Sequence, residues 1–481
     1  MMSITISIGT CVLIACSLAA WLYSASFLIL TLENRRHWKR TLQTKVPTGD
    51  NHPRVCVMVP CKGIESGMEQ NINSFLQQDH PNYRVLFIVE SGHDPAVNLI
   101  QGVMRQNPTA QAKVLVAKQA TNCGQKVHNL CFAVDSLSDD VDIYAFADCD
   151  AATGKSWLQW LVDCIGRENV GARTGYRWMK PGNRRLPTLL ACTANNAIAA
   201  MMGRGGHHLI WGGSWAIHRS VFRATGIREA WEGTVSDDLV ASQALRLSNL
   251  KILFDPRCLC STTVTYSWSS LFEFFRRQFL IARRYAVSYW TTTLLTTIAG
   301  QVAFWGGIAA VIYANAVGNQ FWFNAFQISV AGLYVTSVVR AVLRQNMGRR
   351  IDPQWRRRKT ARHFDIFASP LTGLFTLAAL VASCIGNTIR WRGNHYHIGQ
   401  GGAVRLLGKS IGTTWPIAAG NSTDAPTTAA TPLDRTHVTN QSAATNQGPA
   451  TISFAKNTNQ SDSNQPTTTQ PTAPHRSQDA A

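Results

Sequence analysis

Uncharged apolar runs lie at the start of the chain and again in its second half. Residues 4–32 contain no charged side chain, and a helix of this length is long enough to cross a hydrocarbon core of ~30 Å. Two further runs, 294–317 and 321–343, are joined by a short polar turn and predict a transmembrane hairpin. A last run, 364–389, contains Pro370 and predicts either a further span or a re-entrant segment.

Basic residues directly follow the first apolar run, at Arg35, Arg36, Lys39 and Arg40. A secretory signal peptide is the alternative interpretation of this run, but its basic residues would precede the apolar stretch. We therefore interpret residues 1–32 as a membrane anchor. Because basic residues accumulate on the cytoplasmic side of membrane spans, we expect the domain that follows to be cytoplasmic.

The pattern changes after residue 53, where short apolar segments alternate with amphipathic ones. Strands that alternate with helices predict an α/β fold with a mostly parallel sheet, covered on both faces. Ligands bind beyond the carboxyl ends of the strands in such sheets, so acidic residues directly after strands are candidates for the site. The predicted strands are Val55–Val59, Arg84–Val89, Lys113–Val116, Ile143–Ala147 and Ile252–Phe254, and the predicted helices are Met68–Gln78, Asn98–Gln106, Val127–Leu137 and Trp157–Ile165.

Composition narrows the class of protein. Of 481 residues 45% are hydrophobic and 15% are charged, which excludes a fully disordered chain and is low for a soluble domain, where about 25% are charged. The formal net charge of +19 comes from basic clusters beside the apolar runs, so it favours a membrane surface over nucleic acid. The 12 cysteines lack CxxC spacing, which argues against a zinc ribbon and for reduced thiols. Residues 412–481, rich in Thr, Asn, Gln, Ser and Pro, predict a disordered tail.

Two carboxylates follow one of the predicted strands, in the segment IYAFADCDAAT. Asp148 and Asp150 stand two residues apart, where this strand ends. Hard divalent cations prefer oxygen ligands, and Mg²⁺ commonly takes one or two carboxylates together with substrate phosphates. The pattern suits a metal–diphosphate clamp, and a polar turn is the alternative explanation.

Two other acidic pairs occur in comparable places. Glu90 and Asp94 follow the second predicted strand, where a carboxylate can bind a nucleobase or ribose, or simply shape a turn. Asp237 and Asp238 precede a helical pattern. An acid there can cap the helix, but two adjacent acids exceed what a cap requires, so one of them is a candidate general base.

An ordered series of motifs between residues 53 and 290 resembles the family 2 glycosyltransferases of the GT-A fold, most closely the ceramide glucosyltransferase-like branch. The segment IRWRGNHYHI is also similar to the closing WRG-Y segment of that group. The resemblance implies a Rossmann-like nucleotide-diphospho-sugar transferase domain at 53–290, followed at 291–400 by a membrane region with two to three spans and a basic cytoplasmic loop. The motifs are, in order, VCVMVPCKG, QQDHPNYRVLFIVESGHDPAV, GQKVHNL, ADCDA, GARTGYRW, WGGSWAIHRSVF and SDDLVAS.

The resemblance also implies roles for individual residues. Asp148 and Asp150 match the DxD that holds Mg²⁺ or Mn²⁺ against the donor's diphosphate, and Asp238, with Asp237 beside it, matches the proposed base. The residues implied in nucleotide-sugar binding are Glu90, Asp94, Lys126 and Asp148. The residues implied in contact with the sugar or the acceptor are Gly212, Gly213, Ser214 and Trp215. A solvated lysine is the alternative for Lys126, and a tight turn held by aromatic packing is the alternative for the glycine loop.

The chain departs from the family at its (Q/R)xxRW motif. Arg277 can begin the motif, but Leu280 and Ile281 stand where Arg and Trp are expected. The chemistry requires positive charge near the phosphates of the leaving nucleotide, and arginine supplies it as a planar, bidentate donor. The candidates are Arg277, Gln278, Arg283 and Arg284, and the alternative for each is an interfacial helix whose basic residues reach toward lipid head groups.

We therefore expect an integral membrane, inverting glycosyltransferase with a cytoplasmic catalytic domain. It would move a sugar from a nucleotide-sugar, UDP-linked by resemblance, to the hydroxyl of a lipid-like acceptor. One rival hypothesis is a processive polysaccharide synthase, which needs more spans and an intact QxxRW motif. The other is an inactive membrane scaffold that has kept the fold.

Overall fold

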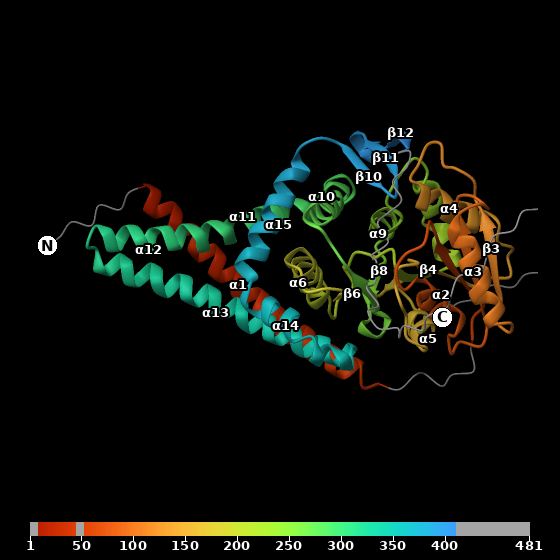
Figure 1. Ribbon diagram of the computed structural model, residues 1–481, viewed down its shortest axis with the longest axis horizontal. Helices are drawn as coiled ribbons and strands as arrows, with labels where there is room; N and C mark the ends of the chain where they lie inside the picture. The colour runs from red at the N-terminus through yellow and green to blue at the C-terminus, as the bar shows by residue number, and fades with distance from the viewer. Residues whose placement is uncertain (1–7, 45–51, 410–481) are drawn as a thin grey trace, which may run out of the picture. The chain divides into compact units, whose positions relative to one another are not determined.

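A mixed seven-stranded sheet forms the core of residues 55–254 (Figure 1). The computed structural model describes residues 8–44 and 52–409. The strand order is β3-β2-β1-β4-β7-β5-β8, and β7 runs antiparallel to its neighbours β4 and β5, whereas the other pairings are parallel. The predicted α/β class with a mostly parallel sheet is confirmed. The strands are β1 (Val55–Pro60), β2 (Tyr83–Val89), β3 (Ala112–Val116), β4 (Ile143–Ala147), β5 (Val170–Thr174), β7 (Ser214–His218) and β8 (Lys251–Phe254).

The five strands predicted from apolar runs are present as β1, β2, β3, β4 and β8, each within one residue of the expected bounds. β5 and β7 lack a continuous apolar pattern, which is why the sequence does not reveal them. β5 contains Gly171 and Arg173, and Arg173 is buried because its guanidinium pairs with Asp255 at 3.2 Å. β7 ends in His218.

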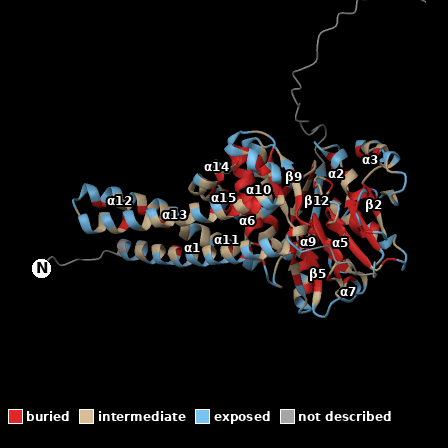
Figure 2. Cartoon of the chain, turned by 90° about the horizontal axis from the view of Figure 1, so that it is seen from below, coloured by how far each residue is buried: buried red, intermediate tan, exposed pale blue. Residues whose placement is uncertain are grey.

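Helices cover both faces of the sheet, because side chains along a strand alternate between the faces. On one face Val57 and Val59 pack against α2, α3 and α5, and on the other Cys56 and Met58 pack against α4, α7, α8 and α9. Figure 2 shows most strands of the main sheet in the colour of buried residues, whereas the edge strand β3 is only partly buried. The helices are α2 (Met68–Leu76), α3 (Pro95–Gln106), α4 (Gln125–Asp135), α5 (Trp157–Val162), α7 (Arg219–Ala224), α8 (Ile227–Ala230) and α9 (Asp237–Leu247).

Two smaller sheets flank the main one. The strands β6 and β9 are parallel, and α6 lies against them through Asn196, whose side chain accepts from the Met179 N–H at 2.9 Å and donates to its carbonyl at 3.0 Å. The strands β10, β11 and β12 form an antiparallel sheet packed on α10. The bounds are β6 (Arg177–Pro181), α6 (Leu186–Met201), β9 (Cys260–Val264), α10 (Trp268–Tyr285), β10 (Thr388–Trp391), β11 (Asn394–Ile398) and β12 (Val404–Lys409), with short 3₁₀ helices at Pro256–Cys258, Pro353–Arg357 and Gln400–Gly402.

Within the described residues, three helices are long and apolar enough to cross a membrane: Ile14–Thr41, Val287–Ala316 and Gln320–Ile351. The last two form the predicted hairpin (Figure 1). A fourth candidate span is the pair of apolar helices α14 and α15, which is bent by 76° at the break between them. This bend suits both a broken span and a re-entrant segment. The helices are α1 (Ile8–Thr41), α11 (Val287–Gln301), a π-helical turn (Val302–Gly306), α12 (Gly307–Ala316), α13 (Gln320–Ile351), α14 (Lys359–Phe367) and α15 (Ser369–Cys384).

The first helix, α1, contacts both the apolar helix α13 and the segment after α6. The Trp21 indole N–H donates to the Ser329 hydroxyl on α13 at 3.1 Å. The Trp38 indole, fully buried, donates to the Met202 carbonyl after α6 at 2.9 Å. Through these contacts α1 lies against α13 and against the segment that follows α6. The predicted tail, 412–481, lies outside the described residues.

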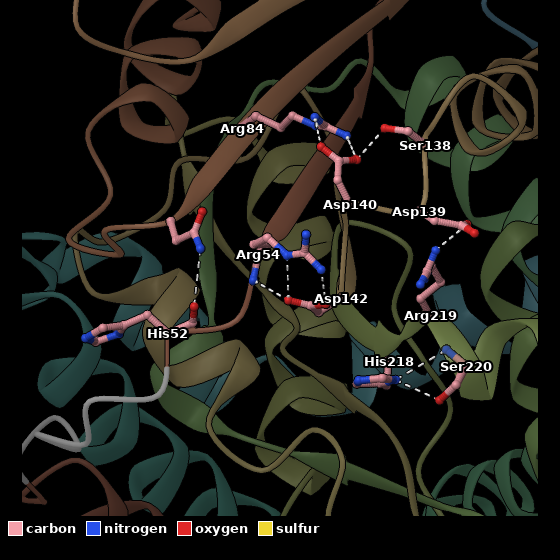
Figure 3. Close-up of polar contacts among 11 residues, drawn as sticks. His52, Arg54, Arg84, Ser138, Asp139, Asp140, Asp142, His218, Arg219 and Ser220 are labelled. Atoms are coloured by element: carbon pink, nitrogen blue, oxygen red, sulfur yellow. Dashed lines mark hydrogen bonds and ion pairs between the residues drawn. The ribbon is translucent and has the colours of Figure 1, made fainter. Parts of the chain in front are cut away.

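Exposed ion pairs tie the amino edge of the main sheet together (Figure 3). Arg54, before β1, pairs with Asp142 at 2.9 Å, and Arg84 on β2 pairs with Asp140 at 2.9 Å. Arg219 pairs with Asp139 of the same loop. Exposed pairs contribute little stability, so their effect is to position the loop that leads into β4. The acidic residues of the candidate site lie at the opposite, carboxyl edge of the sheet.

Candidate active site

The two carboxylates after β4 lie at the carboxyl edge of the sheet. Asp148 and Asp150 are both partly exposed, and Cys149 between them is buried in the core, because alternate side chains of an extended segment point to opposite sides. One carboxylate oxygen of Asp148 forms an ion pair with the Lys126 ammonium, and the two atoms lie 2.9 Å apart. The Oδ1 of Asp150 is buried and has no hydrogen-bond partner among the described residues.

Lys126, in the first turn of α4, joins three parts of the site. Its ammonium lies 2.9 Å from Asp148 and 3.0 Å from Asp237, and it donates to the Gly212 carbonyl at 3.3 Å. Burial lowers the pKa of Lys126, but Asp148, Asp237 and Asp238 outweigh burial and raise it above its ordinary value. The lysine is therefore a permanent cation between β4 and α9, and not a solvated surface residue.

Asp237 and Asp238, at the start of α9, have different surroundings. The Asp237 side chain is 3% exposed, and burial raises its pKa to about 7 although Lys126 opposes the change. Asp238 is partly exposed. Its Oδ1 accepts from the Ser236 hydroxyl at 2.6 Å and the Leu239 N–H at 2.8 Å, and its Oδ2 accepts from the Gly212 N–H at 3.0 Å. Asp238 thus contributes to the cap of α9 and also contacts the glycine loop.

The glycine loop, Gly212 and Gly213, lies so close to neighbouring atoms that neither residue could carry a side chain without a shift. A Cβ on Gly212 would lie 2.7 Å from the Lys126 ammonium and 2.8 Å from Asp237, and a Cβ on Gly213 would lie 2.7 Å from Asp148. The glycines let the backbone approach the charged cluster closely. Ser214 and Trp215, which the resemblance implies in contact with the sugar or the acceptor, lie beneath this backbone. Both are fully buried: the Ser214 hydroxyl donates to the Cys258 carbonyl at 2.9 Å, and Trp215 stacks on Phe146 in the core.

The first acidic pair shapes the loop after β1. The carboxylate of Glu90 pairs with Lys62 at 2.8 Å. The Asp94 carboxylate accepts from the Ala96 N–H at 2.9 Å, which caps α3, and from the Gly63 N–H at 2.8 Å. The turn-forming alternative is therefore realised for Asp94.

The candidate basic residues of α10 face different partners. Arg277 donates to the Arg390 carbonyl at 3.2 Å, and Gln278 is exposed. Arg283 donates to carbonyls at Cys384 and Gly386 and to the Asn387 side chain, and Arg284 also donates to Asn387. Arg283 and Arg284 thus hold the connection from α15 to β10.

A group that sequence reasoning missed lies beside the acidic cluster. Arg392, from the turn between β10 and β11, pairs with Glu65 at 2.6 Å. Burial raises the pKa of Glu65, and the charges of Asp150 and Asp148 raise it further against the effect of Arg392. The sequence signal for this residue is the WRG-Y segment, in which Arg392 stands between Trp391 and Gly393.

Asp148 and Asp150 suit a divalent cation that takes its remaining ligands from a substrate and from water. No group of three or more His, Cys, Asp or Glu side chains suited to a metal occurs in the described part of the chain. Asp148 and Asp150 provide oxygen atoms, and the buried, unpartnered Oδ1 of Asp150 is of the kind a cation would satisfy. Mg²⁺ and Mn²⁺ commonly bind through one or two carboxylates plus phosphate oxygens and water.

The fold and these acidic residues define a GT-A-like domain: a mixed α/β sheet with a D-x-D pair at the carboxyl end of a central strand, flanked by apolar helices. The model of glycosyl transferase family 21 matches residues 13–404, and the chain belongs to this family. The ceramide glucosyltransferase-like branch inferred from the motifs is confirmed.

Curated relatives share parts of the chain. The ceramide glucosyltransferase of Komagataella phaffii is 33% identical over 136 residues, which are 27% of this chain and 26% of that protein. The ceramide glucosyltransferase of Gibberella zeae is 29% identical over 167 residues, 32% of this chain and 30% of that protein. The chain thus spans less than a third of the length of these relatives. Among solved structures, the mannosyltransferase PcManGT from Pyrobaculum calidifontis in complex with GDP-Man and Mn²⁺ is similar with a TM-score of 0.43 and 15% identity, covering 74% of this chain and 99% of that one.

Proposed function

We propose that the protein is a membrane-bound inverting glycosyltransferase that moves a sugar from a nucleotide-sugar, UDP-linked, to the hydroxyl of a ceramide-like lipid. The observation that carries the proposal is the single ammonium of Lys126 that joins Asp148 after β4 to Asp237 on α9, directly under Gly212. Family membership supports the reaction class, and the ceramide glucosyltransferase relatives support the acceptor class.

The donor's diphosphate would bind at the carboxyl end of β4. Asp148 and Asp150 would hold Mg²⁺ or Mn²⁺, which supplies charge neutralisation for the leaving nucleotide. Lys126 holds Asp148 in position, because its ammonium stays protonated between two carboxylates. The Gly212–Gly213 backbone lies directly against these charges, because neither residue carries a side chain.

Asp238 is the group we assign as general base. It is partly exposed, so an acceptor hydroxyl can reach it, whereas Asp237 is buried. In the transfer the acceptor oxygen forms a bond to the anomeric carbon, its proton passes to Asp238, and the bond from that carbon to the diphosphate breaks on the opposite face. General base catalysis of this kind contributes ~10²–10⁴-fold. Asp237 positions Lys126.

The arrangement of apolar helices supports a lipid acceptor. The amphipathic helix α10 lies between the catalytic domain and α11, the first helix of the apolar hairpin. It exposes Trp268 and Phe272, which suit the boundary between head groups and acyl chains. A lipid hydroxyl at that boundary would be close to the carboxyl edge of the sheet, as α10 packs on the segment that precedes α9 through Val235.

The test uses the full chain in lipid nanodiscs with labelled UDP-sugars, ceramide and either Mn²⁺ or EDTA. We expect a chloroform-soluble labelled product that requires the metal and is lost in Asp238→Asn. Asp135→Asn, which removes an exposed partner of Arg228, is the matched control and should remain active. A folded wild-type protein that gives no lipid product with any UDP-sugar would refute the proposal, and a high-molecular-weight product would favour a polysaccharide synthase.

A further inference from the structure

The turn between β10 and β11 presents an arginine in an unusual backbone conformation. Trp391 pairs with Asn394, so Arg392 and Gly393 are the two residues of a tight hairpin turn. Their φ angles are 48° and 80°, as a primed turn requires. Glycine and asparagine are the usual residues in the left-handed region, and other residues cost roughly 1–2 kcal/mol there. Strain of this kind often marks a position held for function.

Arg392 is directed at the loop after β1, next to the D-x-D pair. Its guanidinium pairs with Glu65 at 2.6 Å and donates to the Lys62 carbonyl at 2.9 Å. These contacts account for two of its five N–H donors among the described residues. Burial lowers the pKa of Arg392, but Glu65, Asp150 and Asp148 outweigh burial and raise it, so the guanidinium lies within the field of both carboxylates of the pair.

The two residues that stand where the family motif expects Arg and Trp pack on the small sheet that carries this hairpin. Leu280 and Ile281 are buried and pack with Ile389, Tyr396 and Ile398 of the small sheet. In this chain α10 therefore offers an apolar surface there, and no charge. The sheet is also fixed to the site itself, because the Tyr396 hydroxyl accepts from the N–H of Gln125, the neighbour of Lys126, at 3.2 Å.

Arg277, the remaining arginine of the motif, supports the hairpin as well. It donates to the Arg390 carbonyl, and its guanidinium carbon lies 5.7 Å from the centre of the Trp391 ring. Arg392, next to Trp391 in the sequence, lies within the field of the acidic pair, as Arg177 also does.

We propose that Arg392 contacts the diphosphate of the nucleotide-sugar, and that the hairpin thereby supplies the guanidinium that the motif position at Leu280 lacks in this chain. The inference rests on the proposed function and adds a specific phosphate ligand to it. A planar guanidinium beside a metal–diphosphate clamp can donate two parallel hydrogen bonds to phosphate oxygens and offset the charge that develops on the leaving group.

The experiment measures the dissociation constants of UDP and of uridine, with MnCl₂ present, on the full-length protein in nanodiscs. Arg392→Ala should weaken UDP binding about ten- to a hundredfold, the range expected for a charged hydrogen bond, and leave uridine binding unchanged. Arg405→Ala, an exposed arginine on β12 of the same small sheet, is the matched control and should bind both as the wild type does.

Equal UDP affinity in Arg392→Ala and the wild type would overturn the inference, as would an equal loss for UDP and uridine, which indicates a structural role. If Arg392→Ala does not fold, Arg392→Lys decides. It keeps the charge without the planar fork, so UDP should bind several-fold more weakly, and unchanged UDP binding would overturn the inference. A wild-type protein that binds no UDP would instead refute the proposed function, so the two failures are distinguishable.

Discussion

Removing the ammonium at the centre of the site should destabilise the protein in a way that depends on pH. In Lys126→Met the side-chain length is kept, but Asp148 and Asp237 lose their shared cation. Breaking a buried ion pair from one side costs ~3–5 kcal/mol. We expect the lower end, about 3 kcal/mol, because the Asp148 side chain is 28% exposed and water relieves part of the charge.

The pH dependence follows from Asp237. Its pKa is already raised to about 7 with Lys126 in place, and it must rise further without the lysine. A carboxyl whose pKa is higher in the folded state takes up a proton more readily when folded, so its burial penalty disappears as the pH falls. The deficit of Lys126→Met should therefore be small at about pH 6 and grow as the pH rises through about 7 toward about 8.

The assay is thermal unfolding of the full chain in nanodiscs with EDTA. A loss of about 3 kcal/mol corresponds to a Tm lower by roughly 6–12 °C for a domain of this size. Lys155→Met, an exposed lysine, is the control and should unfold with the wild type. A variant as stable as the wild type at about pH 8, or a deficit that does not change with pH, would refute the assigned charge network.

Three further predictions concern the same domain. Asp150→Asn should abolish Mn²⁺-dependent turnover without lowering the Tm, since Oδ1 has no partner to lose; normal activity would remove Asp150 from the cation site. Gly213→Ala should destabilise the protein by ~1–3 kcal/mol because its Cβ meets Asp148 and Trp211, whereas Gly154→Ala, in open space, should not; equal denaturant midpoints would contradict the packing argument. Burial lowers the pKa of His80 to about 4, so stability should fall as the pH drops from 6.5 toward 4, where only the unfolded chain takes up the proton, and His80→Gln should flatten this acid loss in a pH series of urea melts.

Much of the architecture follows from local patterns in the sequence. Apolar strands such as β4, which is buried along its whole length, and the long apolar helices are recognisable because burial on both sides or exposure to lipid requires a continuous run. Asp148 and Asp150 could be placed at the site because a strand end is read directly from the same pattern. The strands β5 and β7 escape detection, since each contains polar residues within a short span. Arg173 interrupts β5 and is accommodated by its pairing with Asp255, and β7 begins with Ser214 and ends with His218.

The division of labour within the site depends on contacts between distant segments. Asp237 and Asp238 are adjacent and chemically identical in the sequence, and the fold buries one against Lys126 while leaving the other at the Gly212 backbone. Arg392 comes close to Asp150 only because the last small sheet packs on α10. Sequence patterns report which face of a helix or strand is buried, because that depends on the period of the element itself. Which charges meet across the fold is decided by how separate elements pack, and neighbouring residues therefore acquire different roles.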